Sequence, residues 1–148
     1  MSIREEVLNN IEETLAGITI ANGYNTDLTT VTQSIENIDK FEVSEFPVAI
    51  ISYENDDKDT EDIAPDYLGS VLTALIACGI YSTDDKLSIL EKLLVDIEKA
   101  MCLDQTRGGI AAYTIPSDIT LYANLEKENF LYATVKFLIR YYYRFGNP

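Results

Sequence analysis

The sequence contains no histidine and no tryptophan, and it has only two cysteines among its 148 residues. The absence of histidine excludes general acid–base catalysis by imidazole and nucleophilic sites of the Ser-His-Asp type. Cys78 and Cys102 lie in separate apolar stretches, and two cysteines without histidine partners cannot form a four-ligand zinc site. We therefore predict that both cysteines fill the core and that the chain uses no metal and no other cofactor.

Glycine-rich catalytic and phosphate-binding motifs are also missing. The chain has no Gly-x-Ser-x-Gly motif, no Gly-x-Gly-x-x-Gly motif and no phosphate-binding loop ending in Gly-Lys-Ser/Thr. We predict that the protein is not an enzyme. The alternative is a histidine-free enzyme that uses carboxylate, lysine or tyrosine groups in a concave pocket.

Basic residues are scarce, because 11 Lys and Arg stand against 25 Asp and Glu, for a net charge of −14. The first 74 residues hold 3 basic and 16 acidic residues, a net of −13, whereas the second half of the chain is nearly balanced. Phosphate backbones are bound by clustered Lys and Arg, so this composition disfavours nucleic-acid binding.

The acidic excess is densest between residues 54 and 66, where only Lys58 offsets it. The acidic residues of this segment are Glu54, Asp56, Asp57, Asp59, Glu61, Asp62 and Asp66. No frame of the segment supplies both the sixth-position glycine and the twelfth-position glutamate of a calcium-binding loop. We predict a solvated loop or an interaction surface here.

Long hydrophobic runs are absent as well. The longest apolar run, residues 68–81, is shorter than the stretch of about 20 residues that a membrane-spanning helix needs. The first six residues contain no signal-peptide core. We predict one soluble domain covering residues 1–148, located in the cytoplasm and without membrane association.

Two helices are predicted from caps and apolar periodicity. Ser2 and Glu5 have the spacing of a capping box, and apolar residues recur at helical spacing from Ile3 until Gly17. Thr83-Asp84-Asp85 precedes a second helix with one apolar face. That face consists of Leu87, Leu90, Leu94, Ile97 and Met101.

Several segments are rich in β-forming residues. Residues 18–21 and 28–33 flank Asn22-Gly23, which predicts a hairpin or two bent strands. Residues 48–53 follow Pro47 as a further strand, and residues 68–81 predict a largely buried strand, with a helix as the alternative. A loop through Pro116 then leads to a strand over residues 119–125.

The last element, residues 131–145, alternates with period two. Its odd positions are Leu131, Ala133, Val135, Phe137, Ile139, Tyr141, Tyr143 and Phe145. A strand of this length spans about 50 Å, whereas the usual strand of five or six residues spans about 17–20 Å. We predict that its far end projects beyond its own sheet, where a partner covers it.

Taken together, the elements predict an α+β fold: a mostly antiparallel β-sheet with two helices packed on one face and a long C-terminal strand. Gly108-Gly109, after Asp104 to Arg107, predicts an exit from the second helix, with an anion-binding nest as the alternative.

Tyr141, Tyr142 and Tyr143 between Arg140 and Arg144 resemble a stacking platform for single-stranded nucleic acid. The alternation argues against this interpretation, because it directs Tyr141 and Tyr143 toward the core. A subunit interface is the preferred interpretation, since interfaces favour Tyr and Arg.

Opposite charges at the two ends of the chain predict head-to-tail contact between copies. The hypothetical interface residues are Lys136, Arg140, Tyr142 and Arg144 in a basic row, and Asp56, Asp57, Asp59, Glu61 and Asp62 in the acidic segment.

Some stretches resemble a known family. The second helix runs out through residues 100–111 into an Asp-x-Thr-x-Gly-Gly segment, and the chain closes with Ile139-Arg140-Tyr141-Tyr142-Tyr143 and then Gly146-Asn147-Pro148. Asn22 to Asp27, followed by Val31, and Phe46 to Ile50 add weaker similarity. These features are similar to the tail-terminator (tail-completion) proteins of long-tailed bacteriophages. Arg107 stands where that family more usually has an aliphatic residue.

The resemblance implies a structural virion protein that forms a ring, hexameric in that family. The ring would cap the tail tube, end its polymerisation and join it to the head connector. Its expected partners are further copies of itself, the tail tube protein and the head-tail connector or stopper protein, with DNA passing through the lumen without specific binding. The expected location is the tail or neck of the virion, with assembly in the host cytoplasm. Another connector or stopper ring protein and a small nucleic-acid-binding accessory protein are the alternatives.

Overall fold

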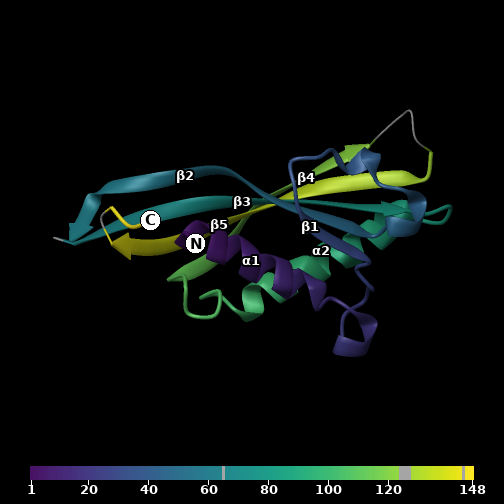
Figure 1. The fold of residues 1–148 in the computed structure, drawn as a ribbon. Helices are drawn as coiled ribbons and strands as arrows, with labels where there is room; N and C mark the ends of the chain where they lie inside the picture. The colour runs from purple at the N-terminus through teal and green to yellow at the C-terminus, as the bar shows by residue number, and fades with distance from the viewer. Residues whose placement is uncertain (65, 124–127, 145) are drawn as a thin grey trace.

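The computed structural model describes residues 1–64, 66–123, 128–144 and 146–148, with the backbone alone for residues 60–64. Its helices are α1 (Ile3–Ala16) and α2 (Lys86–Leu103), and short 3-10 turns lie at Ile20–Asn22, Ile38–Lys40 and Val43–Glu45. Its strands are β1 (Thr30–Gln33), β2 (Val48–Ala64), β3 (Tyr67–Tyr81), β4 (Tyr113–Ala123) and β5 (Phe130–Arg144). Figure 1 shows the long strands running side by side above the two helices.

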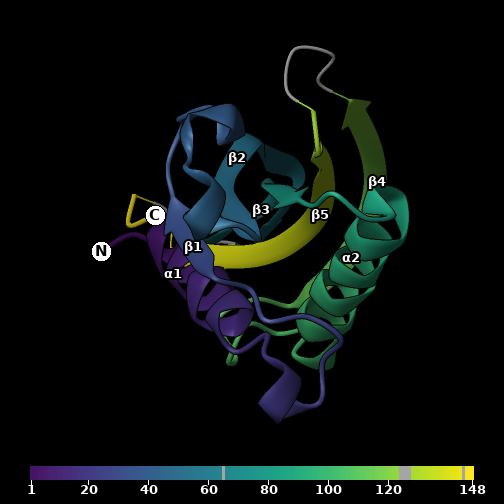
Figure 2. The same cartoon turned by 90° about the vertical axis from the view of Figure 1, so that its right-hand side faces the viewer.

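The five strands form one sheet in the order β1-β2-β3-β5-β4. All neighbouring pairs are antiparallel except β1 and β2, which run parallel. Figure 2 shows both helices under the same face of the curved sheet, α1 beside β1 and α2 beside β4. The predicted α+β fold with a long C-terminal strand is confirmed.

The two helices begin at the predicted caps. Ser2 and Glu5 form the capping box of α1, with Ser2 N donating to Glu5 Oε2 at 2.7 Å and Glu5 N donating to Ser2 Oγ at 3.2 Å. The Asp85 side chain caps α2 by accepting from Ser88 N. The buried faces of both helices pack on the sheet and form the main core with β3 and β5.

Strands β3 and β5 pair without interruption from Tyr67–Arg144 to Tyr81–Phe130. The odd positions of β5 are buried against the helices, as the alternation predicts, while its even positions face the other side. The prediction that the far end of β5 projects beyond its sheet is wrong, because β3 is equally long and covers one edge of it throughout. The last predicted position, Phe145, lies outside the described residues.

A second, smaller core covers one end of the opposite sheet face. Ile38, Val48, Ile50 and Phe130 are buried there, and the 3-10 turns of residues 38–45 cover them. Gly79 of β3 lies directly beneath Ile38, whose Cδ1 would stand 2.8 Å from a Cβ at that position. This turn packs closely because β3 has no side chain there.

Most of the acidic segment 54–66 is not a loop, so the loop interpretation of the sequence is wrong. Most of it continues β2, whose backbone pairs with β3 as far as Ala64–Tyr67. A register shift at Glu54 lies between the Tyr53–Ala74 and Asn55–Thr73 pairs, and a second shift follows Asp59. The strand therefore changes the face on which its side chains lie after Tyr53.

The predictions for the short strands are partly wrong. Residues 18–21 contain no strand, and residues 30–33 pair in parallel with Val48 to Ile51 instead of forming a hairpin. Strand β4 begins at Tyr113 and includes Pro116, which an edge strand tolerates because its outer amides need no partner. Residues 124 and 125, which we assigned to this strand, lie outside the described residues.

The predicted exit from α2 is confirmed. Arg107, Gly108 and Gly109 all have positive φ. Arg107 is buried and donates to the carbonyl oxygens of Met101 and Asp104 at the end of the helix, where a cation is favoured. Asp104 Oδ2 accepts from Gly108 N at 2.7 Å. The Arg107 side chain therefore caps the C-terminal end of α2.

The two cysteines differ in their burial. Cys78 is buried in the main core, where desolvation raises the pKa of its thiol to about 12. Cys102 is half-buried, and both thiols are free.

Neither helix in the described part of the chain is long and apolar enough to cross a membrane.

Candidate functional site

The predicted basic row meets the acidic half of β2 on the sheet face opposite the helices. Arg140 Nη2 donates to Asp59 Oδ2 at 2.8 Å, and Lys136 Nζ lies 3.0 Å from Glu54 Oε2. Each ion pair joins β5 to β2 across β3. The structure therefore brings these charges together within one chain, whereas the sequence prediction places them in two copies.

Gly69 of β3 allows the Arg140 side chain to reach across the sheet. A Cβ at this position would lie 2.9 Å from Arg140 Nη2 and 3.2 Å from Tyr142 Cε1. Arg140 also donates from Nε to Tyr142 Oη at 2.9 Å, and its guanidinium carbon lies 5.2 Å from the centre of the Tyr142 ring. The missing side chain at Gly69 thus opens the path for the ion pair.

The other predicted interface residues are placed less centrally. Arg144 and Asp57 are exposed, and Asp57 Oδ2 accepts from Asn55 Nδ2 at 2.9 Å. Tyr142 is also exposed. The side chains of Glu61 and Asp62 lie outside the described residues. Tyr141 and Tyr143 are buried on the helix side, so the three tyrosines do not form one exposed stacking platform.

Asp56 lies on the helix side of the sheet, away from the other predicted acidic residues. Its side chain is 6% exposed. Tyr141 Oη donates to Asp56 Oδ2 at 2.5 Å, and Arg4 Nη1 and Lys58 Nζ each lie 3.2 Å from the same oxygen. Ser70 donates to the second carboxylate oxygen. This cluster, which we name the Asp56 cluster, joins α1, β2, β3 and β5.

The cluster shifts the pKa of several of its members. Burial alone would raise the pKa of Asp56, but the hydrogen bonds from Ser70 and Tyr141 and the charge of Lys58 lower it. Burial and the hydrogen bond to Asp56 raise the pKa of Tyr141. Burial acts to lower the Lys58 pKa, yet hydrogen bonds to Tyr143 and Asp56 outweigh it and raise that pKa. The carboxylate and the lysine are therefore both charged at neutral pH.

Sequence reasoning missed Arg4, Lys58, Ser70 and Tyr141 as partners of Asp56. The spacing of Asp56 and Lys58 does place them on one face of a strand. The register shift at Glu54 decides which face that is, and no sequence pattern marks this shift. Within the described residues, no group of three or more Cys, Asp and Glu side chains is arranged to hold a metal ion.

Two different edges of the sheet expose apolar side chains. At one edge lies β4, where Ile119 and Leu121 are 50% and 51% exposed. At the other edge, beside β1, Ile35 is 99% exposed and Tyr53 is 43% exposed. A hollow of about 420 Å³ lies at this second edge, lined by both of these residues and Leu8. Figure 2 places the two edges on opposite sides of the molecule.

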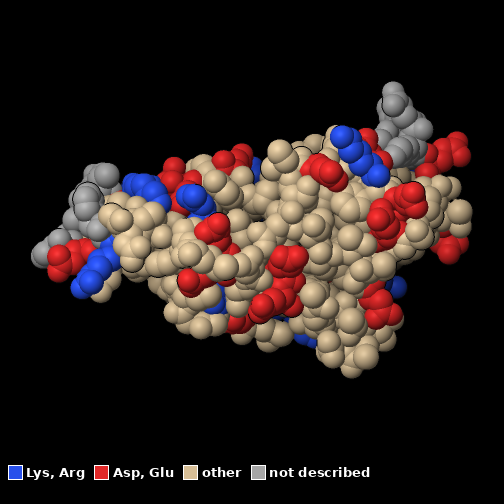
Figure 3. Space-filling view, in the orientation of Figure 1, with Lys and Arg blue, Asp and Glu red and all other residues tan. Residues whose placement is uncertain are grey.

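Beyond its pairing with β1 at Val48 to Ile51, β2 has no strand on its outer side in the described part of the chain. The outer side of β4 also has none. Unpaired backbone groups of this kind can pair with a further strand. Figure 3 shows acidic side chains spread over the side of the molecule on which α1 lies in front, with several basic side chains toward the end where β2 turns into β3.

We expect Asp56→Asn to lower the free energy of unfolding by about 2 kcal/mol at pH 7, because the buried carboxylate loses its charge-assisted hydrogen bonds and the partly exposed Arg4 and Lys58 lose their shared counter-charge. Urea unfolding followed by circular dichroism measures this change. The folded-state pKa of Asp56 lies below its ordinary value of 3.8, so its stabilisation is complete above that pH and is lost as pH falls through the folded-state pKa. The difference between the two proteins should therefore shrink below about pH 4.

Asp57→Asn is the matched control, since this neighbouring side chain is exposed, and we expect a change within about 0.5 kcal/mol. Equal losses for the two variants would contradict the role given to the Asp56 cluster.

We expect Gly69→Ala to cost about 1 kcal/mol, because the new Cβ displaces the Arg140 guanidinium from Asp59. A double-mutant cycle with Asp59→Asn checks the cause by urea unfolding. Once Asp59 cannot form the ion pair, the cost of Gly69→Ala should fall. Additive losses would show that Gly69 does not act through this pair.

Comparison with known proteins does not place the chain in a family. No family model matches it, and no curated protein matches it significantly. The functional conclusion therefore depends on the exposed edges, the charge distribution and the family resemblance.

Proposed function

We propose that this chain is a non-enzymatic structural subunit of a bacteriophage tail. Copies join head to tail in a closed ring that caps the tail tube, ends its polymerisation and connects it to the head. This proposal combines the resemblance to tail-terminator proteins with the presence of two unlike apolar edges on one sheet. The pair of unlike edges is the observation that carries it.

Unlike edges favour a ring over a two-fold dimer. The β4 edge presents Ile119 and Leu121, whereas the β1 edge presents Ile35 and Tyr53 beside a hollow. When one edge of a copy meets the other edge of the next copy, each new subunit leaves one edge free for a further subunit. Such a contact closes into a ring when an integer number of equal rotations between neighbours completes a full turn.

Apolar edges are better suited to this contact than the charged residues of β2 and β5. Arg140 and Lys136 already pair with Asp59 and Glu54 inside the chain. A contact between copies through these residues would first have to break the internal pairs. The proposed interface therefore lies at the β1 and β4 edges and not in the basic row and the acidic segment.

The net charge of −14 fits a ring through which DNA passes. Like charges repel, so an acidic lumen does not hold a phosphate backbone. The same charge and the burial of Tyr141 and Tyr143 speak against the alternative of a nucleic-acid-binding accessory protein. Another head-to-tail connector or stopper ring would use the same unlike edges, and binding to purified tail tube protein separates these two roles.

We expect the double variant Ile119→Lys, Leu121→Lys to stay folded and to lose ring formation, because charges on an exposed edge strand oppose its pairing. Sedimentation velocity measures the assembly, and circular dichroism checks the fold. Wild-type protein should sediment as a ring and the variant as a monomer.

The control is the double variant Ile20→Lys, Val43→Lys, which adds the same charge at two similarly exposed apolar residues. It should assemble as wild type does. If the β4 variant forms rings with wild-type affinity, the β4 edge is not the interface; if wild type stays monomeric with and without tail tube protein, the ring function is wrong.

A further inference from the structure

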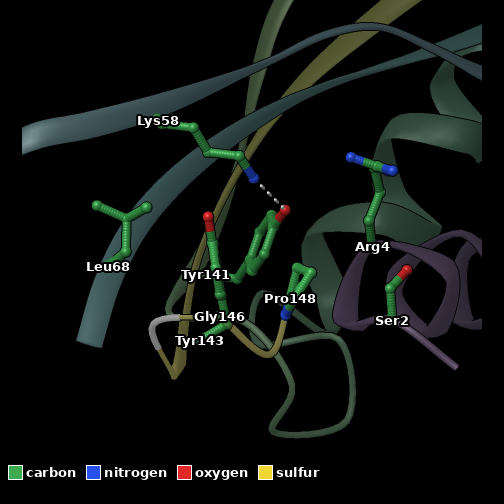
Figure 4. A pocket seen from close by; sticks show the side chains of 8 residues that line it. All are labelled: Ser2, Arg4, Lys58, Leu68, Tyr141, Tyr143, Gly146 and Pro148. Carbon is green, nitrogen blue, oxygen red and sulfur yellow. Dashed lines mark hydrogen bonds between the residues drawn. The ribbon is translucent and has the colours of Figure 1, made fainter. Parts of the chain in front are cut away.

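A pocket of about 460 Å³ lies at the end of the sheet, between the start of α1 and the β2–β3 hairpin. Figure 4 shows Arg4 on one side of this pocket and Lys58 on the other, with the Tyr141 and Tyr143 rings between them. The full lining is Ser2, Arg4, Lys58, Leu68, Tyr141, Tyr143, Gly146 and Pro148. Cavities of this size hold small ligands or a single projecting side chain.

Two cations that line the pocket, Arg4 and Lys58, share a single carboxylate partner, Asp56. Arg4 and Lys58 both contact Asp56 Oδ2, and together the three groups sum to one positive charge. Asp56 also accepts from Tyr141 and Ser70, so both of its oxygens accept hydrogen bonds within the chain. Among the described residues, these are the only two cations that share one carboxylate.

Arg4 retains the capacity to bind a further anion, whereas the three N–H donors of Lys58 are engaged with Asp56, Ser70 and Tyr141. The side chains of Arg4 and Lys58 are 37% and 36% exposed, respectively. Arg4 uses Nη1 for Asp56 and makes no other hydrogen bond to a described side chain, so most of its five N–H donors remain for a ligand. A guanidinium with free parallel donors matches the two oxygens of a carboxylate.

The rest of the wall is apolar and aromatic. Leu68, Tyr143 and Pro148 line it, and Lys58 Nζ lies 4.6 Å from the centre of the Tyr143 ring. A ligand here must therefore carry an apolar body beside its charge. A phosphate would bring a larger negative charge close to Asp56, which a site with a single excess positive charge does not balance.

We propose that this pocket binds a single carboxylate carried on an apolar or aromatic group. The carboxylate lies against the Arg4 guanidinium, beside the charge of Lys58, and the apolar group lies against Leu68, Tyr143 and Pro148. The site does not depend on ring formation. Its ligand can be a free organic acid or an acidic side chain of a second copy, since both present the same chemistry.

The test is an NMR titration of the full chain with phenylacetate and, separately, with its neutral analogue phenylacetamide. Phenylacetate should shift the ring resonances of Tyr141 and Tyr143 saturably and bind at least about tenfold more tightly than phenylacetamide, since an interaction with a charged group contributes about 1.5–3 kcal/mol. Arg4→Gln should weaken phenylacetate binding by a similar factor. Lys40→Gln, which removes an exposed positive charge outside the pocket, should leave it unchanged.

Dilution of the wild-type protein without added ligand identifies the source of the carboxylate. If a second copy supplies it, the same two tyrosine resonances shift with protein concentration and Arg4→Gln abolishes the effect; if a free acid is the ligand, only phenylacetate moves them. Any of three results overturns the proposal. Phenylacetate and phenylacetamide bind equally, neither compound binds at a 20-fold excess over about 1 mM protein, or inorganic phosphate binds as tightly as phenylacetate. The comparison of phenylacetate with phenylacetamide does not depend on whether rings form.

Discussion

The uninterrupted antiparallel pairing of β3 with β5 is the constraint on which the other features of this structure depend. It runs from Tyr67–Arg144 to Tyr81–Phe130 and fixes which side chains of both strands face the helices. Because β3 and β5 lie at the centre, β2 and β4 occupy opposite flanks of the sheet. A shift of this pairing by one residue would exchange the core and surface faces of both strands. The same pairing thus determines the core, the ion pairs across β3 and the two exposed edges.

Charge is distributed around this pairing in a way that allows a strongly acidic strand to form. On the open face Arg140 and Lys136 neutralise Asp59 and Glu54, and on the helix face Arg4 and Lys58 neutralise Asp56. Ion pairs this exposed contribute little individually, but the Asp56 carboxylate is buried and requires its partners. The acidic half of β2 is therefore compatible with a strand because β5 and α1 supply cations from distant parts of the sequence.

The sequence predicts those elements whose signal is local. Both helices follow from caps and apolar periodicity, and β3 and β5 follow from long runs of β-forming residues. The acidic half of β2 was not predictable in this way, because Arg140 lies 81 residues from the Asp59 that it neutralises. The parallel pairing of β1 with β2 is another long-range contact, and the Pro116 in β4 is acceptable only because that strand lies at an edge. For the candidate site, the sequence indicates Asp56 as acidic but not its position on the helix face, which the register shift at Glu54 determines.

The most direct test of the account is chemical cross-linking between copies through the two edges. In a Cys102→Ser background, a chain carrying both Ile35→Cys and Ile119→Cys is treated with a short bismaleimide, while Cys78 stays buried. Contact between unlike edges predicts a ladder of covalent oligomers for the double variant and only monomers for each single variant. Covalent dimers of the Ile119→Cys single variant would instead show that like edges meet, which contradicts a head-to-tail ring.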